Sequence, residues 1–381
     1  MSTVSRRAVL AGAMGVLAAG CRPGEGETPP PAVVGAAHQD GIVTPPPDAA
    51  VFAAFDLTVQ GRDGLAAVLR RLGDRASPSE GASVTIAVGA SLFDQRFGLE
   101  SLRPRHLTAM PPFRGDVLDP AACHGDLLVQ VCAPTVEKAA EALRAATDGL
   151  EVKPRWRIDG FRPENRADGP GGARTTRNLF GFREGAGNPD VRDTAMMDRL
   201  VWTNPASGEP ASGEPASGEP AWTAGGSYQV IRLIRMALPL WAADSIAEQE
   251  AVFGRRKAGG AVLGRERETD EPDYSSDPEG RTVPLDAHIR LANPRTPETA
   301  DSLILRRGIN FSRGFDADGH LDQGLAFVSF QRRMQQFLAT QARLAGEPLE
   351  EYIEPQGGGF FLALPGVSDD PADFLGRALV S

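Results

Sequence analysis

Five segments of the first half show the periodicity of regular elements: strand, helix, strand, strand and helix, at residues 50–59, 63–76, 83–90, 126–133 and 135–147. The first helix places Leu65, Leu69 and Leu72 on one face, with Val68 beside them. The apolar runs on either side are short and rich in β-branched residues, as strands are. A last strand is expected near 152–161. This order is the pattern of a ferredoxin-like unit.

The second half repeats this order. Strand, helix, two strand-like pieces and a helix are predicted at residues 227–238, 244–254, 287–293, 324–331 and 335–346. Ser245 and Glu248 have the spacing of a capping box, which fixes the start of the first of these helices. The predicted fold class is therefore α+β, with two ferredoxin-like halves of antiparallel sheet and helices.

The segments around these halves set the domain bounds. Residues 22–47 are rich in proline and glycine and predict a linker that settles onto the domain near 38–42. Residues 48–200 form the first half and residues 225–381 the second. Between them, residues 201–224 contain three identical Ala-Ser-Gly-Glu-Pro pentamers, whose composition cannot bury a core, and this predicts a solvated insertion.

Residues 1–21 resemble an export signal. Arg6 and Arg7 precede an apolar segment, 8–20, that is too short to span a bilayer. The arginine pair resembles a twin-arginine signal, the route of proteins that fold before export. Cys21 resembles a lipoprotein acceptor, although Leu17 lies one position further out than usual. We expect an exported, periplasmic or extracellular protein. Lipid on Cys21 stays open and is the only membrane contact expected.

Composition narrows the function classes. The chain has 381 residues, is 41% hydrophobic and carries a net charge of −10. A nucleic-acid partner is excluded, because phosphate binding needs a concentrated basic surface. Cys123 and Cys132 lie too far apart along a strand to form a disulfide, and with His124 they make only a weak metal motif. We interpret both cysteines as small buried residues.

The loop Asn178–Asp190 places Glu184 among glycines in a run that cannot be a regular helix. A solvated turn and a functional loop are both compatible with it. His288 lies in an apolar segment, where a core histidine and a ligand are alternatives. Eighteen residues later, Arg306 and Arg307 follow an apolar run. Arginine in such a position is costly to bury without an anionic partner.

Together these motifs resemble one family. The segments 178–190, 225–236, 248–257, 286–295, 304–314 and 324–353 are similar, in order, to the dye-decolourising peroxidases, and specifically to the exported type encoded with iron-uptake systems. The resemblance runs from about His38 to Pro365. It implies a haem b, one per chain, between the sheet and helices of the second half.

The resemblance also implies a role for each residue. His288 is the implied iron ligand, Glu184 the distal carboxylate and Arg306 the distal arginine. Glu351 is the implied acceptor of the other N–H of His288. The implied haem-contacting residues are Gly185, Ala186, Gly187, Asn293, Pro294, Arg295 and Arg306, with Arg295 meeting a propionate.

Two residues depart from the family pattern. Glu184 stands where aspartate is usual, which shifts the carboxylate by roughly 1 Å, a displacement that can cost ~10²-fold in rate. Ile309 stands where exported members often have tyrosine.

Three functions are weighed. The first is a peroxidase that reduces hydrogen peroxide and oxidises bulky dye-like or phenolic reductants. The second is an exported haem-binding, iron-release protein of deferrochelatase type, with components of an iron-uptake system as partners. The third is an exported binding lipoprotein without redox chemistry. Self-association into a homo-oligomer is left open.

Overall fold

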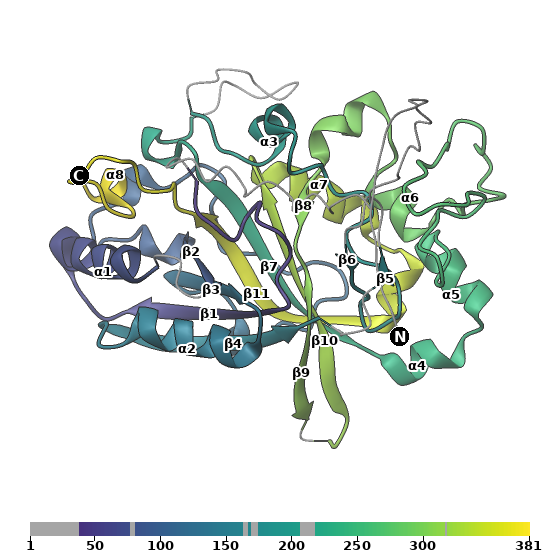
Figure 1. Cartoon of the computed structure of the whole chain (residues 1–381), viewed down its shortest axis with the longest axis horizontal. Helices are drawn as coiled ribbons and strands as arrows, with labels where there is room; N and C mark the ends of the chain where they lie inside the picture. Colours follow the sequence, from purple (N-terminus) through teal and green to yellow (C-terminus); the bar gives the residue numbers. More distant parts are fainter. Residues whose placement is uncertain (1–37, 77–80, 163–166, 169–173, 206–217, 317) are drawn as a thin grey trace, which may run out of the picture. The chain divides into compact units, whose positions relative to one another are not determined.

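The computed structural model describes residues 38–76, 81–162, 167–168, 174–205, 218–316 and 318–381 (Figure 1). The predicted export signal and most of the predicted linker lie outside these ranges. None of the helices within them has the length and apolar character of a membrane span.

The first half forms the predicted elements in the predicted order: β1 (Ala49–Leu57), α1 (Gly61–Arg75), β2 (Ser83–Gly89), β3 (Leu127–Ala133), α2 (Val136–Thr147) and β4 (Val152–Phe161). Helix α1 buries Leu65, Val68, Leu69 and Leu72, as its periodicity predicted. Alternate residues of β1 serve two cores, because successive strand side chains point to opposite faces. Phe55 belongs to the core that includes residues of α1 and α2, while Phe52 belongs to a second core on the opposite face of the sheet.

The second half contains β7 (Ser227–Met236), α4 (Leu238–Ala243), α5 (Ile246–Phe253), α6 (His288–Ala292), β8 (Leu305–Arg306), β9 (Ile309–Phe315), β10 (Leu321–Gln331), α7 (Met334–Leu344) and β11 (Ile353–Ala363). Shorter elements are β5 (Ala167–Asp168), β6 (Arg174–Thr175), α3 (Thr194–Leu200) and α8 (Arg377–Val380). The capping box of Ser245 and Glu248 is present at the start of α5, as predicted.

One predicted element is wrong. Residues 287–293 were expected to be strand-like, but His288–Ala292 form the short helix α6. The amides of Arg290 and Leu291 both bond to the carbonyl of Ala287, which closes a helical turn. A five-residue apolar run is too short for its periodicity to separate helix from strand.

Nine of the described strands form one antiparallel sheet in the order β7-β11-β2-β3-β1-β4-β9-β10-β8, and β5 and β6 form a separate pair. Strand β7 also pairs with β10, which closes the sheet into a barrel-like ring. The two halves meet at short seams, and β4 pairs with β9 only through Gly160 and Phe161. A Cβ at Gly160 would lie 2.5 Å from Ile309, so this close approach requires glycine. The hairpin of β9 and β10 extends beyond the rest of the sheet (Figure 1).

The edges of the predicted linker and insertion pack against this unit. Gln39 is buried and bonds to backbone groups of Ile86 and Leu364, so the chain is docked near the predicted point. Val201–Thr203 and Trp222–Thr223, at the two ends of the predicted insertion, are also buried. The pentamers themselves lie outside the described residues, except for their last three residues, 218–220.

Candidate active site

The loop that carries Glu184 is held by a small set of backbone bonds. The amide of Glu184 donates to Thr176, and the amide of Asn178 donates to Phe182. Gly181, Gly185 and Gly187 all have positive φ, which explains why the loop needs glycine at those points. Asn178 Nδ2 donates to Glu184 Oε1 at 2.9 Å and orients the carboxylate. The predicted turn is therefore an ordered loop that presents one acid.

Arg306 is tied directly to this loop. It lies on β8, which pairs with β10 at Ser329. Its Nη2 donates to the carbonyl of Ala186 at 2.7 Å, and its amide donates to Asn188 Oδ1 at 3.1 Å. Asn188 returns a bond from Nδ2 to the carbonyl of Arg306. Within the described ranges no carboxylate forms an ion pair with Arg306, so its charge is available to a ligand.

His288 begins helix α6 and has one strong partner. Its Nδ1 lies 2.7 Å from Glu347 Oε2, and the side chain of Glu347 is only 4% exposed. Burial lowers the pKa of His288, but the Glu347 carboxylate outweighs it, so that the net pKa is raised. The Nε2 atom has no hydrogen-bond partner among the residues described. The ring also packs against Phe253, with centroids 5.8 Å apart.

The structure brings the three predicted catalytic and ligand residues together. The pKa of His288, set mainly by burial and Glu347, is also lowered by Arg306 and raised by Glu184. Such electrostatic effects act over short distances in a protein. Glu184, Arg306 and His288 thus lie near enough to influence one another electrostatically, although they come from three separate parts of the chain.

The prediction that Glu351 accepts the N–H of His288 is wrong. Glu351 is exposed at the end of the turn that precedes β11, and Glu347, four residues earlier, takes the role. Glu350 bonds instead to the amide of Gly346 and pairs with Arg114. Glu347, Glu350 and Glu351 lie within five residues, so the sequence alone could not show which of them bonds to His288. That is decided by the path of the chain after α7, which brings Glu347 to α6.

Two further arginines border the site. Arg255 was not identified from the sequence; it donates to the carbonyl of Gly260 and forms no ion pair with any carboxylate that the structure describes. Burial lowers its pKa, and the charge of Arg306 adds to the effect. Arg295 has a positive φ of 58° and pairs with Glu271 at 2.9 Å. Its amide donates to Asn293 Oδ1, which helps to hold the turn Asn293–Arg295.

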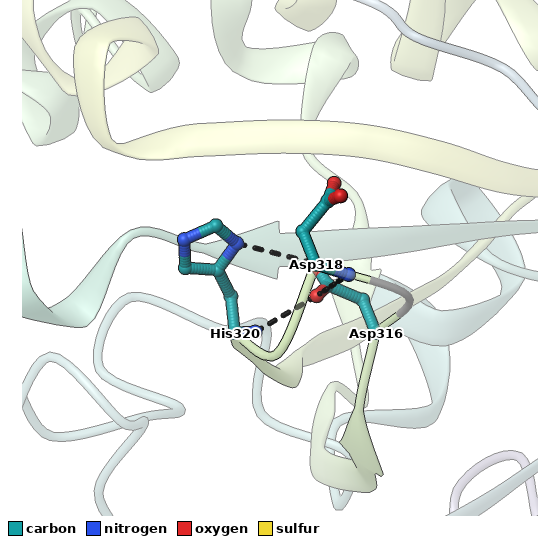
Figure 2. A group of neighbouring side chains, drawn as sticks. All are labelled: Asp316, Asp318 and His320. Atoms are coloured by element: carbon teal, nitrogen blue, oxygen red, sulfur yellow. Dashed lines mark hydrogen bonds and ion pairs between the residues drawn. The ribbon is translucent and has the colours of Figure 1, made fainter.

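The remaining histidines lie elsewhere. His320 belongs to a group with Asp316 and Asp318 at the tip of the β9–β10 hairpin, and Figure 2 shows the three side chains. Their spacing could hold a metal ion, but both oxygens of the Asp316 carboxylate already have partners within the protein. Its Oδ1 accepts the amides of Asp318 and His320, and its Oδ2 pairs with Arg235 at 2.7 Å. We interpret the group as an exposed turn. Cys123 and Cys132 are free and buried, as predicted.

Comparison with known proteins decides the family. The chain matches the family models "Dyp-type peroxidase, C-terminal" over residues 175–368 and "Dyp-type peroxidase, N-terminal" over residues 39–162. The chain belongs to the Dyp-type peroxidase family. A deferrochelatase of Escherichia coli (strain K12) is 42% identical over 376 residues, which cover 90% of this chain and 86% of that protein.

Solved structures agree with this assignment. An oxyferrous complex of DtpA from Streptomyces lividans is 34% identical, with a TM-score of 0.78, and the match covers 90% of this chain and 95% of that one. A DyP-type peroxidase from Cellulomonas bogoriensis is 33% identical, with a TM-score of 0.77 and coverage of 90% and 96%. The α+β fold with an antiparallel sheet is thus that of Dyp-type peroxidases.

Haem is the cofactor of this family, and the residues present fit it. His288 offers a free Nε2 while its Nδ1 is held by a buried acid, which is the arrangement of a metal-binding imidazole. Arg306 and Arg255 lack carboxylate partners in the part of the chain described, as expected beside an anionic group. A Cβ at Gly185 or Gly187 would meet no atom within 4 Å, so the loop borders open space.

Proposed function

We propose that this Dyp-type peroxidase reduces hydrogen peroxide with haem b and oxidises bulky dye-like or phenolic reductants. The observation that carries the proposal is the pairing of His288 with the buried Glu347, together with Arg306, which forms no ion pair with any carboxylate in the described ranges. A metal-binding imidazole commonly has its other ring nitrogen held by a carboxylate in this way.

On the ligand side, Glu347 fixes the imidazole. Its carboxylate accepts a hydrogen bond from the Nδ1–H group of His288. The proton of the neutral imidazole therefore stays on Nδ1, and the lone pair of Nε2 can bind the metal. The same bond increases the basicity of the ring, and in haem proteins a more basic ligand favours cleavage of the O–O bond.

Around the ring, two loops would hold the haem. Gly185, Ala186 and Gly187 lie against open space on one side. Asn293, Pro294 and Arg295 form the turn after α6, where Arg295 can meet a propionate. Arg255 supplies a second cation for this purpose. A guanidinium suits a carboxylate ligand because its N–H groups bond to both oxygens.

On the peroxide side, haem would supply the redox chemistry when bound, and the residues of this chain would handle the proton and the charge. Glu184 would take a proton from one oxygen of hydrogen peroxide and return it to the other. Asn178 occupies Oε1 of Glu184 and leaves Oε2 for this transfer. Arg306 stabilises the negative charge on the departing oxygen. Its bonds to Ala186 and Asn188 fix the guanidinium beside the loop that carries the acid.

We also propose a ferredoxin-like plan for each half, with haem between the sheet and helices of the second. The strand order β2-β3-β1-β4 in the first half corresponds to β9-β10-β7-β11 in the second, in sequence position and pairing. In chain order, helices lie between the first and second strands of each half: α1 in the first half, and α4, α5 and α6 in the second. One helix, α2 or α7, lies between the third and fourth strands.

A second function is iron release from haem, and the 42% identity to a deferrochelatase favours it. In this proposal the chain acts with components of an iron-uptake system after export through the twin-arginine signal. Substituting both Arg6 and Arg7 with lysine should then retain the protein inside the cell. Normal export of that double variant would remove the argument that haem is loaded before translocation.

The spectrum of the purified protein tests the proposal. We expect a Soret band that is lost in His288→Ala, and turnover of an anthraquinone dye with peroxide. A Soret band without turnover, together with release of iron from added haem, would favour the second function. No Soret band after reconstitution with haem would eliminate both.

A further inference from the structure

A cavity in the first half has a lining that the proposed function does not use. Its volume is about 610 Å³, which is typical of pockets that hold small organic molecules. It is lined by residues of β1, β4 and β11 and of the loops beside them, and none of these residues belongs to the proposed haem site. The titratable residues of the lining are Asp56, Arg96, Arg103, His124, Asp126 and Arg155.

Arg96 and Asp126 satisfy each other and form one wall of the cavity. The side chain of Asp126 is 2% exposed, and its two oxygens accept bonds from the Arg96 guanidinium at 2.8 and 2.9 Å. They also accept the Ser91 hydroxyl and the amide of Leu57. The other N–H groups of Arg96 donate to Asp94 and to the carbonyls of Ser91 and Leu57. This pair therefore has no group left for a ligand.

The remaining charges of the lining favour an anion. Asp56 pairs with Arg155 at 3.1 Å. Arg155 also donates from Nε to the carbonyl of Cys123 and from Nη2 to that of Pro120, which leaves one N–H of Nη2 without a partner among the described residues. Arg103 forms no ion pair with any carboxylate in the described ranges. The lining thus contains three arginines and two aspartates, and both aspartates are already paired.

His124 has an unusual backbone conformation at this cavity. Its φ is 60°, in the left-handed region that residues other than glycine rarely adopt. Its amide donates to the carbonyl of Gly358, and its carbonyl accepts Trp156 Nε1, both at 2.8 Å. A Cβ at Gly359 would lie 3.2 Å from the Cα of His124, so the turn is packed closely against β11. Rare backbone conformations that the surrounding structure enforces are concentrated at functional sites.

The ring of His124 is available to a ligand. It is half-buried and has no hydrogen-bond partner among the residues described. Burial lowers its pKa, and the charge of Arg155 acts in the same direction, so the ring is neutral at pH 7. The two side chains are thus near enough to influence each other electrostatically. A neutral imidazole keeps one N–H group to donate, and the turn therefore presents this donor close to Arg155.

We infer that this cavity binds a small aromatic carboxylate. Its carboxylate would accept hydrogen bonds from Arg103, Arg155 and His124. A guanidinium suits this group, because its planar N–H groups match the two oxygens of a carboxylate. Phe360 and two alanines supply an apolar part of the lining, against which an aromatic ring can pack. The inference rests on neither haem nor peroxidase activity.

Calorimetric titration of the haem-loaded full chain with benzoate, at constant ionic strength set with chloride, tests this site. We expect saturable binding to one class of site and no shift of the Soret band. Benzamide has the same shape without the charge and should bind about tenfold more weakly or worse. Acetate has the charge without the ring and should also bind more weakly. Absence of saturable benzoate binding, or equal binding of benzamide, would overturn the inference.

Two variants remove donors from the lining. Arg103 is exposed and outside any described ion pair, so Arg103→Gln should fold normally. His124→Asn shortens the side chain but keeps the turn, because asparagine adopts the left-handed region more readily than most residues. Each variant should bind benzoate about tenfold more weakly in the same titration, since each loses a hydrogen bond to a charged group. Wild-type affinity in both variants would overturn the inference.

Three other arginines are matched controls. Arg105 is exposed and close to Arg103 in sequence, and Arg157 lies on β4 and pairs with Asp159 at 2.6 Å. Neither lines the cavity, so Arg105→Gln and Arg157→Gln should bind benzoate normally. Arg306→Gln should do so as well, because Arg306 belongs to the proposed haem site. An equal loss in Arg103→Gln and Arg105→Gln would indicate unspecific attraction to positive charge. Loss in Arg306→Gln alone would place benzoate at the haem site. Either result would overturn the inference.

Thermal unfolding separates effects on binding from effects on folding. Benzoate should raise the unfolding temperature of the wild type and of Arg105→Gln, because a ligand that binds only the folded state stabilises it. It should raise that of Arg103→Gln and of His124→Asn less. An equal increase in all four proteins would show that benzoate acts elsewhere, and the inference would fall.

Discussion

The two sides of the proposed haem site are built differently. On the side of α6, one bond joins His288 to Glu347, a carboxylate almost fully removed from solvent. On the side of the glycine loop, Glu184 receives one bond from Asn178, and Arg306 is held by loop backbone and Asn188. The first side is suited to hold a metal ligand in one state. The second side presents a carboxylate, Glu184, and a guanidinium, Arg306, that can act on a proton and on a negative charge.

This difference predicts that substitutions on the two sides have different effects, which experiments can test. Changes on the His288 side should alter how much haem the protein holds. Changes on the Glu184 side should leave haem content equal and alter the reaction with peroxide. A variant on the Glu184 side that lowers haem content would contradict the division of roles.

The largest effect is expected from His288→Ala. Without the imidazole no other side chain on α6 can bind iron, so haem retention should be abolished while the fold persists. Absorbance of the purified variant at the Soret band measures this directly. His320→Ala is the matched control, because His320 is exposed on the β9–β10 hairpin and should be replaceable without loss.

The next effect concerns the partner of the ligand. Glu347→Gln keeps the size of the side chain but removes its charge, and we expect haem affinity to fall by ~10–100-fold, as for other partners of metal-binding histidines. Titration of the haem-free protein with haem measures the affinity. Glu351→Gln should behave as wild type, since Glu351 is exposed. If Glu351→Gln were the weaker binder, the assignment of Glu347 would be wrong.

On the opposite side, Arg306→Leu should lower the rate of reaction with peroxide by about 10³-fold, because it removes the group that stabilises the departing oxygen. Glu184→Gln should lower the rate by about 10²-fold, less than the arginine variant, since water can relay part of the proton transfer. Stopped-flow mixing with peroxide measures both rates. Haem content must be equal to that of the wild type for the rates to be compared.

The smallest effect is expected from Glu184→Asp. Aspartate is the usual family residue, so the rate with peroxide should rise or stay the same. The same stopped-flow measurement applies. A loss of about tenfold or more would show that the loop, with its bond from Asn178, is arranged around the longer acid, because ~1 Å of displacement can have such an effect.

The sequence was most informative where local pattern decides structure. The spacing of Leu65, Val68, Leu69 and Leu72 predicted α1 and its buried face, and the capping box predicted the start of α5. It failed for residues 287–293, where five residues of α6 give no clear period. Strand order, and the closure of the sheet by β7 and β10, depend on contacts far apart in the chain and could not be derived.

The candidate site shows the same limit. Glu184, Arg306 and His288 were identified by motif resemblance, and the fold brings them together. Glu347 and Asn188 were missed, since each acts through a partner 59 or 118 residues away. No local signal separates Glu347 from Glu350 and Glu351. Arg307 gave a signal, a costly arginine after an apolar run, but its surroundings could be found only in the structure.

The central claim is that His288 binds the haem iron and that Glu347 makes it a stronger ligand. Resonance Raman spectroscopy of the reduced, haem-loaded protein tests it most directly, through the iron–histidine stretching band. The account predicts such a band in the wild type and a shift to lower frequency in Glu347→Gln, because a neutral partner makes the imidazole less basic. A band that is absent from the wild type, or unchanged in Glu347→Gln, would contradict the claim.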